Sequence, residues 1–209
     1  MPWHRENNRQ GVSELKGRRN RNTVILDGWI IYEGERIEIC NAEKYGVYKE
    51  IIVSFIKQLD AAINIHKRVM VLRLDFHMNY FTETNYKFSK FIKNINQWLN
   101  RHYLIKDIGY QWVREQERAK KQHYHLAIIL DGDLIQNPSK IIEIIREKWL
   151  PNGSMRIPDN CFYYLDKHNH KEGRKNVIYR ASYMAKSRGK SYRAVQTKSY
   201  FSSRLKPNI

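Results

Sequence analysis

Residues 108–130 constrain the fold most, because two runs rich in apolar and aromatic residues flank the charged segment 117–122. Both runs contain residue types that suit a pleated, half-buried surface, so the pattern predicts a β-hairpin. In an extended chain, side chains two residues apart point to the same face. His123 and His125 therefore project together, while Tyr124 faces the other way.

The facing strand of this hairpin carries Glu115 and Glu117, which also share a face. Two imidazoles and a carboxylate on rigid backbone suit a divalent cation, with positions left open for solvent or substrate. Because both glutamates lie on the same face of the strand, the alternation of side chains does not decide between them. A shift of the strand register by one residue would point both away from the histidines. We choose Glu115, with His123 and His125, because it lies farther from the turn. Two polar histidines on an exposed strand face are the alternative.

The composition indicates a soluble protein that binds a polyanion. The chain has 209 residues, a formal net charge of +17 and a pI near 9.9, and nucleic acid is the first candidate partner. Its 14 Tyr and 5 Trp could stack on unpaired bases. A polar N-terminus and the lack of a run of about 18 apolar residues predict a cytoplasmic protein without a membrane partner. Cys40 and Cys161 are isolated, which predicts neither a zinc site nor a disulfide.

The chain is expected to form one domain behind a basic arm. Residues 1–21 contain few apolar side chains and are predicted to be a flexible arm that touches phosphates or a solubilising tail. Residues 22–209 are expected to form a single domain, with its motifs over 67–190 and a basic tail over 191–209. Short strands with turns over 23–40 would extend this domain.

Apolar residues at helical spacing predict helices over 43–65 and 83–102. Asn137 and Pro138 are expected to open a further helix that ends before Pro151. Together with a strand over 161–165, these elements predict an α+β fold. Its centre would be an antiparallel sheet of about five strands, with the histidine strand in the middle and helices on its faces.

Residues 68–78 predict a strand with two chemically different faces. One face is apolar, and the other carries Arg73, Asp75 and His77. Three ionisable groups on one face are costly unless they are paired or exposed in a cleft, so we expect them to line a site. A salt-bridged sheet edge is the alternative. A second His-x-His, at 168–170, lies in a turn-like segment and is expected to be exposed.

A tyrosine motif near the end of the chain completes the set. Residues 177–188 have a helix-forming composition, which would place Tyr179, Tyr183 and Lys186 on one face at i, i+4 and i+7. A lysine in this position can hold phosphate oxygens or stabilise a phenolate.

Three motifs in this order resemble the HUH endonuclease superfamily, specifically the rolling-circle replication initiators of filamentous phages and related plasmids and satellites. They are the segment 73–77, Glu115 with the segment 123–125, and the Tyr-x-x-Lys of residues 183–186. The resemblance covers residues 67–190 and implies an RRM-like core. This chain has Tyr124 where the family has an aliphatic residue, and the position requires only a large hydrophobic body that faces the core.

The resemblance implies a site- and strand-specific nuclease in the cytoplasm of a bacterial host. Tyr183, assisted by Lys186, would nick single-stranded origin DNA or an origin hairpin, giving a 5′-phosphotyrosine and a 3′-hydroxyl that starts rolling-circle replication. Tyr179 would be a second nucleophile or a packing residue. The cofactor would be Mg or Mn, and a host helicase and polymerase would be partners. The residues expected to contact DNA are Arg73, Asp75, His77, Arg114, Arg180 and Arg188.

Two alternatives remain open at this point. Single-tyrosine transposases and relaxases share the superfamily, but they usually differ in histidine number and in the position of the tyrosine. A non-catalytic nucleic-acid-binding protein would bind mainly through counterion release, with a steep dependence on salt.

Overall fold

A computed structural model of the chain describes residues 23–40, 42–116, 121–190 and 197–207. The basic arm predicted over residues 1–21 and the alternative ligand Glu117 lie outside these ranges. Within them, none of the helices combines the length and the apolar character needed to cross a membrane.

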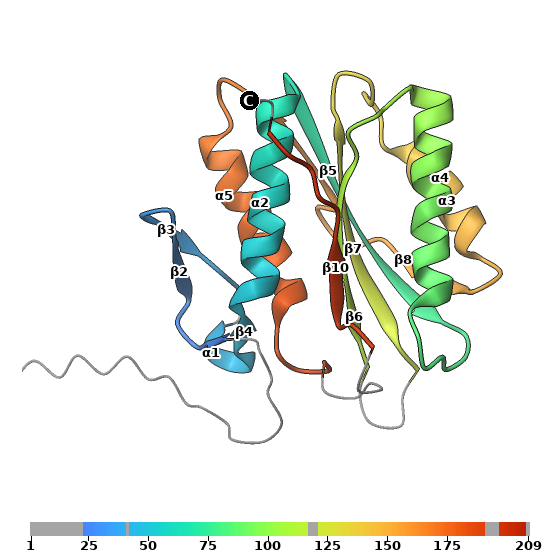
Figure 1. The fold of residues 1–209 in the computed structure, drawn as a ribbon, viewed down its shortest axis with the longest axis horizontal. Coiled ribbons are helices and arrows are strands. Elements are labelled where there is room, and N and C mark those ends of the chain that lie inside the picture. Colours follow the sequence, from blue (N-terminus) through green and yellow to red (C-terminus); the bar gives the residue numbers. More distant parts are fainter. Residues whose placement is uncertain (1–22, 41, 117–120, 191–196, 208–209) are drawn as a thin grey trace, which may run out of the picture.

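The fold is α+β, with a six-stranded antiparallel sheet between helices (Figure 1). This confirms the predicted class and the central place of the histidine strand. The strands lie in the order β10 (Tyr200–Ser202), β6 (Gly109–Glu115), β7 (His123–Asp131), β5 (Arg68–Met78) and β8 (Gly153–Arg156), and β9 (Phe162–Asp166) pairs with the other half of β5. Hydropathy did not reveal β8 and β10, because they have only four and three residues.

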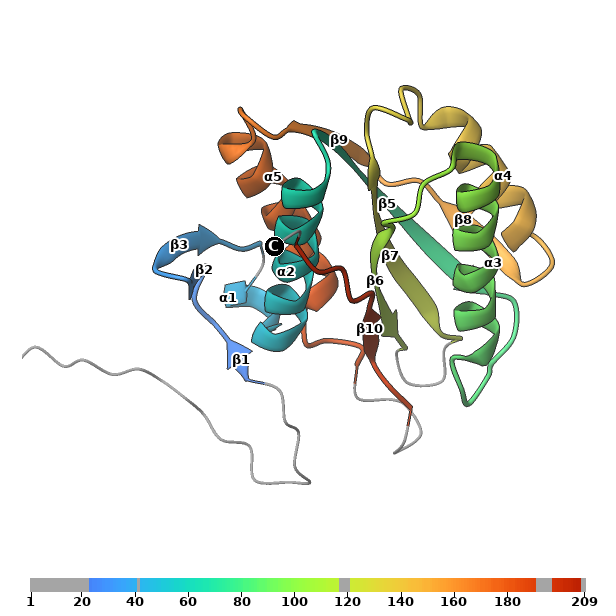
Figure 2. The same cartoon turned by 45° about the horizontal axis from the view of Figure 1, so that its top comes forward.

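Helices cover both faces of the sheet. α2 (Lys49–Ile65) and α5 (Lys171–Ser182) pack on one face, and α3 (Tyr86–Tyr103) and α4 (Ser139–Trp149) pack on the other (Figures 1 and 2). α4 begins after Pro138, and the Asn137 Oδ1 just before it accepts a hydrogen bond from the Ser139 N–H at 2.9 Å. The helix predicted over 83–102 corresponds to α3, and the strand predicted over 161–165 corresponds to β9. Their ends differ from the predicted ends by a few residues at most, as is usual for element boundaries.

The helix predicted over 43–65 is wrong in its first turns. The structure divides it into α1 (Ala42–Tyr45), β4 (Val47–Tyr48) and α2. Gly46 separates them with a φ of +64°, a conformation that interrupts a right-handed helix. β4 then pairs with β1 (Val24–Ile25), so the apolar residues at 47 and 48 are buried as a strand rather than as a helix face.

The two faces of the sheet have separate cores. On the α3 and α4 side the core is aromatic: the Tyr124 ring stacks on Phe88 with centroids 4.0 Å apart. The Tyr124 hydroxyl donates to Asn85 Oδ1 at 3.0 Å, which satisfies its only buried polar group. Tyr124 therefore fills the core beneath the hairpin, as the alternation of side chains along the strand predicts. Its neighbours His123 and His125 lie on the opposite face of the sheet, the α2 and α5 side.

A hairpin of β2 (Trp29–Tyr32) and β3 (Glu35–Glu38) packs beside α2 and α5 (Figure 2). Its turn residues, Glu33 and Gly34, both have positive φ, which matches the twist of a two-residue hairpin. Alternate residues of the hairpin, including Ile30 and Ile37, join the same core as the two helices. The other face of the hairpin stays exposed.

Arg174 connects this hairpin to the rest of the core. Its guanidinium binds both carboxylate oxygens of Asp60 on α2, at 2.7 and 2.9 Å, and Glu35 on β3 at 2.9 Å. Because both acids are partly exposed, we expect Arg174→Met to lower the free energy of unfolding by only about 1–2 kcal/mol. Urea denaturation measures this loss. Lys171→Met, on an exposed position of the same helix, should cost less, and an equal loss in both variants would contradict the prediction.

Candidate metal centre

A polar site lies on the α2 and α5 side of the sheet, at the end of the three central strands. In the observed register, His123 lies opposite Glu115 on β6 and His77 on β5, and His125 lies opposite Asp75 on β5. Farther along the same strands, this face carries core residues such as Val71 and Ile129 that pack against the two helices. The polar residues begin where the helices no longer cover the sheet.

Glu115, His123 and His125 form a group that could bind a metal. Each offers one ligand atom, and the three atoms lie within 4.8 Å of one another. Glu115 Oε2 is 3.2 Å from His123 Nε2 and 3.3 Å from His125 Nε2. The structure thus brings together the three predicted ligands, and it does so with Glu115 opposite His123. Glu117 lies outside the described residues.

The environment of His125 fits a metal ligand. His125 Nδ1 lies 2.6 Å from Asp75 Oδ1, so the carboxylate fixes the ring, while the buried Nε2 faces Glu115 Oε2 at 3.3 Å without the geometry of a hydrogen bond. A carboxylate on one ring nitrogen and a free second nitrogen is the usual arrangement of a metal-binding histidine. A divalent cation would satisfy the Nε2 atom, which faces Glu115.

Asp75 has a role inside the protein that the sequence did not indicate. Burial alone would raise the pKa of Asp75, but the hydrogen bond with His125 and the charge of Arg73, 3.5 Å away, lower it below its usual value. Asp75 stays ionised and orients His125. Asp75 also lines the cleft in front of the site, and its contact with DNA stays a prediction.

Asp75→Asn should weaken binding of Mn²⁺ by about 10–100-fold, the usual effect of losing an outer partner of a ligand histidine. The amide keeps the shape but loses the charge that holds the imidazole. Isothermal titration with Mn²⁺ measures the affinity. Asp166→Asn, on the exposed end of β9, is the control, and equal affinities for Asp75→Asn and wild type would contradict the assigned role.

Two lysines hold the carboxylate of Glu115. Lys190 Nζ lies 2.9 Å from Oε1, and Lys186 Nζ lies 3.1 Å from Oε2. Burial would raise the pKa of Glu115, but the hydrogen bond with His123, the close contact with His125 and the charge of Lys190 lower it well below its usual range. Burial lowers the pKa of Lys190 to about 8, although Glu115 opposes the change. No pattern in the sequence distinguishes Lys190, since it is one of many lysines in a basic segment.

Tyr183 and Lys186 lie beside this group, but not on one continuous helix as predicted. α5 spans Lys171–Ser182, and a 3-10 turn follows over Tyr183–Ala185. The helix ends because Lys186 forms a β-bridge with Val47 and the Ser187 N–H donates to the Gly46 carbonyl at 2.8 Å. The turn still lets the ammonium of Lys186 reach the Tyr183 hydroxyl, at 2.9 Å.

The Tyr183 ring closes one side of the site. It lies 5.9 Å from the His125 ring, and Lys186 Nζ lies 4.1 Å from its centroid. A cleft of about 500 Å³ opens in front of these residues. Basic side chains line it, including Arg73, Arg180 and Arg156, the last of which the sequence did not indicate. This cleft presents positive charge around the metal group.

Residues 35–200 match the family model described as the YagK/YfjJ C-terminal domain. The chain belongs to this family. The matched region contains Glu115, His123, His125, Tyr183 and Lys186, so the whole candidate site lies within the YagK/YfjJ C-terminal domain. Searches of curated proteins and of solved structures gave no match.

Within this YagK/YfjJ C-terminal domain, the other residues expected to contact DNA separate into two groups. His77 and Arg180 line the cleft with Arg73, and the His77 ring stacks on His123 at 5.3 Å. Burial and the charge of His123 lower the pKa of His77, which favours its neutral form. Arg188 is exposed but lies beside Tyr45, 5.9 Å from the ring, and is not part of the cleft lining.

Arg114 is a correction. It faces the opposite side of the sheet from Glu115, and its guanidinium donates to the carbonyls of Thr82 at 3.0 Å and Glu83 at 3.2 Å. Only 2% of the residue is exposed. Arg114 thus holds the segment before α3 against β6 and is not placed to contact DNA.

Tyr179 lines the cleft but differs from Tyr183 in its surroundings. The residue is 45% exposed, and the hydrogen bond from Lys186 goes to Tyr183. His168, of the second His-x-His, is exposed as predicted.

Proposed function

We propose that this chain is a metal-dependent endonuclease that nicks single-stranded DNA with Tyr183 as the nucleophile. One observation carries the proposal. The Tyr183 hydroxyl, at the end of α5, lies 2.9 Å from Lys186 Nζ, which in turn lies 3.1 Å from Glu115 in the group that could bind a metal. A phenol, a cation and a metal-ligand set from separate elements thus meet at one point, as a phosphoryl-transfer site requires.

The reaction proposed is a transesterification. The Tyr183 oxygen bonds to the phosphorus as the bond between phosphorus and the 3′ oxygen breaks, which leaves a 5′-phosphotyrosine and a free 3′-hydroxyl. The phenol gives its proton to solvent, and the departing 3′ oxygen takes one from solvent. A bound divalent cation would supply polarisation of the scissile phosphate and offset its charge. The stored ester allows the strand to be rejoined without ATP.

Lys186 would assist by stabilising the phenolate. Phenols are weak nucleophiles in neutral water, so a nearby cation is needed. Burial would lower the pKa of Lys186, but the charge of Glu115 and the contacts with Tyr183 raise it above its usual value. Lys186 therefore stays protonated and keeps its charge beside the Tyr183 oxygen.

The proposed substrate follows from the charge of the cleft and of the chain. The net charge of +17 and the arginines that line the cleft favour a polyanion. Attack on one strand requires an unpaired or extruded strand. Mixed imidazole and carboxylate ligands without thiolates favour Mg or Mn over zinc.

Within this reaction class we propose the role of a rolling-circle replication initiator. Transposases and relaxases use the same transesterification, and the late Tyr-x-x-Lys of residues 183–186 is the feature that favours an initiator. The finer role has its own test: after nicking of a circular template, the 3′-hydroxyl should support extension by an added polymerase and helicase. Nicking without extension would instead favour the alternatives.

The proposed activity is tested with a pool of 3′-labelled single-stranded oligonucleotides and Mn²⁺. Because the tyrosine keeps the 5′ phosphate, the labelled 3′ fragment should remain on the protein in a denaturing gel. EDTA should remove the adduct. If the protein binds the pool but forms no adduct under any metal condition, it is a non-catalytic nucleic-acid-binding protein and the proposal is wrong.

A further inference from the structure

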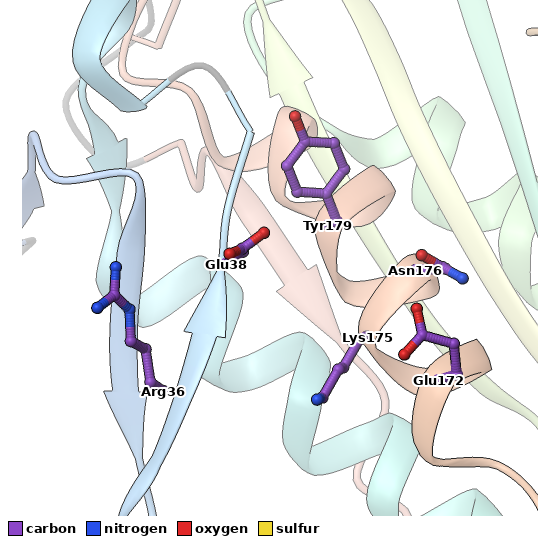
Figure 3. Close-up of a pocket in the computed structure, with 6 residues that line it drawn as sticks. All are labelled: Arg36, Glu38, Glu172, Lys175, Asn176 and Tyr179. Atoms are coloured by element: carbon purple, nitrogen blue, oxygen red, sulfur yellow. The ribbon is translucent and has the colours of Figure 1, made fainter.

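A second pocket lies between β3 and α5 (Figure 3). Its lining differs from that of the cleft beside Glu115, His123 and His125, which we call the metal cleft. It encloses about 490 Å³, within the range of pockets that hold small organic groups. The residues that line it are Arg36, Glu38, Glu172, Lys175, Asn176 and Tyr179. The four from α5 recur at helical spacing and so form one face of the helix.

The walls of this pocket are fixed to the core. Arg174 ties β3 to α2 and α5 through Glu35 and Asp60, and Ile37 packs beneath β3 at 1% exposure. The polar groups within the pocket are, by contrast, open. Across the described ranges, the side chains of Glu38, Glu172, Lys175 and Asn176 form no hydrogen bond or ion pair with the rest of the protein. Their donors and acceptors are available to a ligand.

The charge of the pocket selects against a phosphate. Two basic and two acidic side chains line it, so it has no net charge, whereas the metal cleft is lined by several arginines. A polar ligand that has no net charge and is flat enough to lie on a tyrosine ring matches this lining. Nucleobases meet these conditions, since their edges carry hydrogen-bond donors and acceptors and their faces stack on aromatic rings.

The position of the pocket connects it to the candidate active site. Tyr179 lines both the pocket and the metal cleft, and it stands one helical turn before Tyr183. This turn corresponds to about 6 Å along the helix axis. A strand whose phosphate lies at Tyr183 would therefore bring a neighbouring base to the Tyr179 ring. Figure 3 shows the Glu38 carboxylate pointing across the pocket toward α5.

We propose that this pocket reads one unpaired nucleobase next to the scissile phosphate. The base stacks on Tyr179, and its edge contacts Asn176 and the carboxylate of Glu38. A carboxylate accepts hydrogen bonds only, so it favours a base that carries an exocyclic amino group, such as adenine or cytosine, over thymine, whose N3–H lies between two carbonyl oxygens that repel the carboxylate. This inference rests on the proposed function for its substrate, and it assigns the sequence preference to a site outside the metal group.

The experiment measures base preference by binding alone, so that it does not depend on nicking. Tyr183→Phe protein selects ligands from a random single-stranded DNA pool, and the bound sequences are read. At one position, bases with an exocyclic amino group should be enriched. Adding Asn176→Ala or Glu38→Gln should reduce this enrichment about 10-fold, the usual effect of losing one base-edge contact.

Two further variants separate stacking from other roles of Tyr179. Tyr179→Leu should lose the preference because the ring is gone, whereas Tyr179→Phe should keep it. Lys171→Ala, on α5 but outside the pocket, is the control and should select the same sequences as the parent. Circular dichroism of each variant confirms that it is folded before the comparison.

The inference is overturned if the pocket variants select the same sequences as the parent. It is also overturned if thymine is preferred, if no position is selective, or if the variants weaken binding to all sequences equally. These results are distinct from failure of the proposed function, which appears as the absence of a covalent adduct with the wild-type protein.

Discussion

Replacing Tyr183 by Phe is expected to lower the yield of covalent protein–DNA adduct by more than about 1,000-fold, because the substitution removes the attacking oxygen itself. Binding of single-stranded DNA should persist, since the ring and the arginines of the cleft remain. The adduct is measured on a denaturing gel with labelled oligonucleotide and Mn²⁺, and binding is measured by fluorescence anisotropy at the same salt concentration.

Tyr179→Phe is the matched control for this prediction. Tyr179 lies on α5, in the turn before Tyr183, lines the same cleft and is more exposed than Tyr183, but the hydrogen bond from Lys186 goes to Tyr183. The adduct should therefore survive Tyr179→Phe. If this variant loses the adduct and Tyr183→Phe retains it, the two tyrosines exchange roles. Loss in both variants would indicate a reaction that needs two nucleophiles.

Glu115→Gln should weaken the binding of Mn²⁺ by more than about 100-fold, which exceeds the usual effect of losing an outer partner of a ligand. The substitution removes the charge toward which both histidines point. It should also destabilise the fold by about 3–5 kcal/mol, because Lys190, with 1% of its side chain exposed, would lose the partner of its buried charge. Calorimetric titration measures the first effect and urea denaturation the second.

A double variant separates these two effects. Glu115→Gln with Lys190→Met removes both charges of the buried pair, so that neither charge is left buried without its partner. The stability should then return toward that of wild type, while Mn²⁺ binding stays lost. Recovery of metal binding in the double variant would show that Glu115 supports the fold and is not a ligand.

Some features of this site can be predicted from local sequence patterns, and others cannot. The two faces of residues 68–78, and the common face of His123 and His125, follow from the alternation of side chains along a strand. Alternation is a property of each short segment, so the sequence is sufficient to predict it. The α+β class and the central histidine strand follow from the same patterns, and the structure confirms both.

Boundaries set by distant contacts were not predictable in the same way. Residues 177–188 have a helical composition, yet α5 ends at Ser182 because Lys186 and Ser187 pair with the segment 46–47. That segment is more than a hundred residues away in the chain, and no local propensity contains it. The same pairing places Lys186 where it contacts both Tyr183 and Glu115.

The sequence by itself determined which side chains share a face, and therefore that Glu115, His123 and His125 could meet. Only the tertiary structure decided the register that places Glu115 opposite His123, the burial of Arg114 and the roles of Asp75 and Lys190. The physical reason is that the direction of a side chain depends on its own backbone, whereas its partners depend on which strands and helices pack beside it.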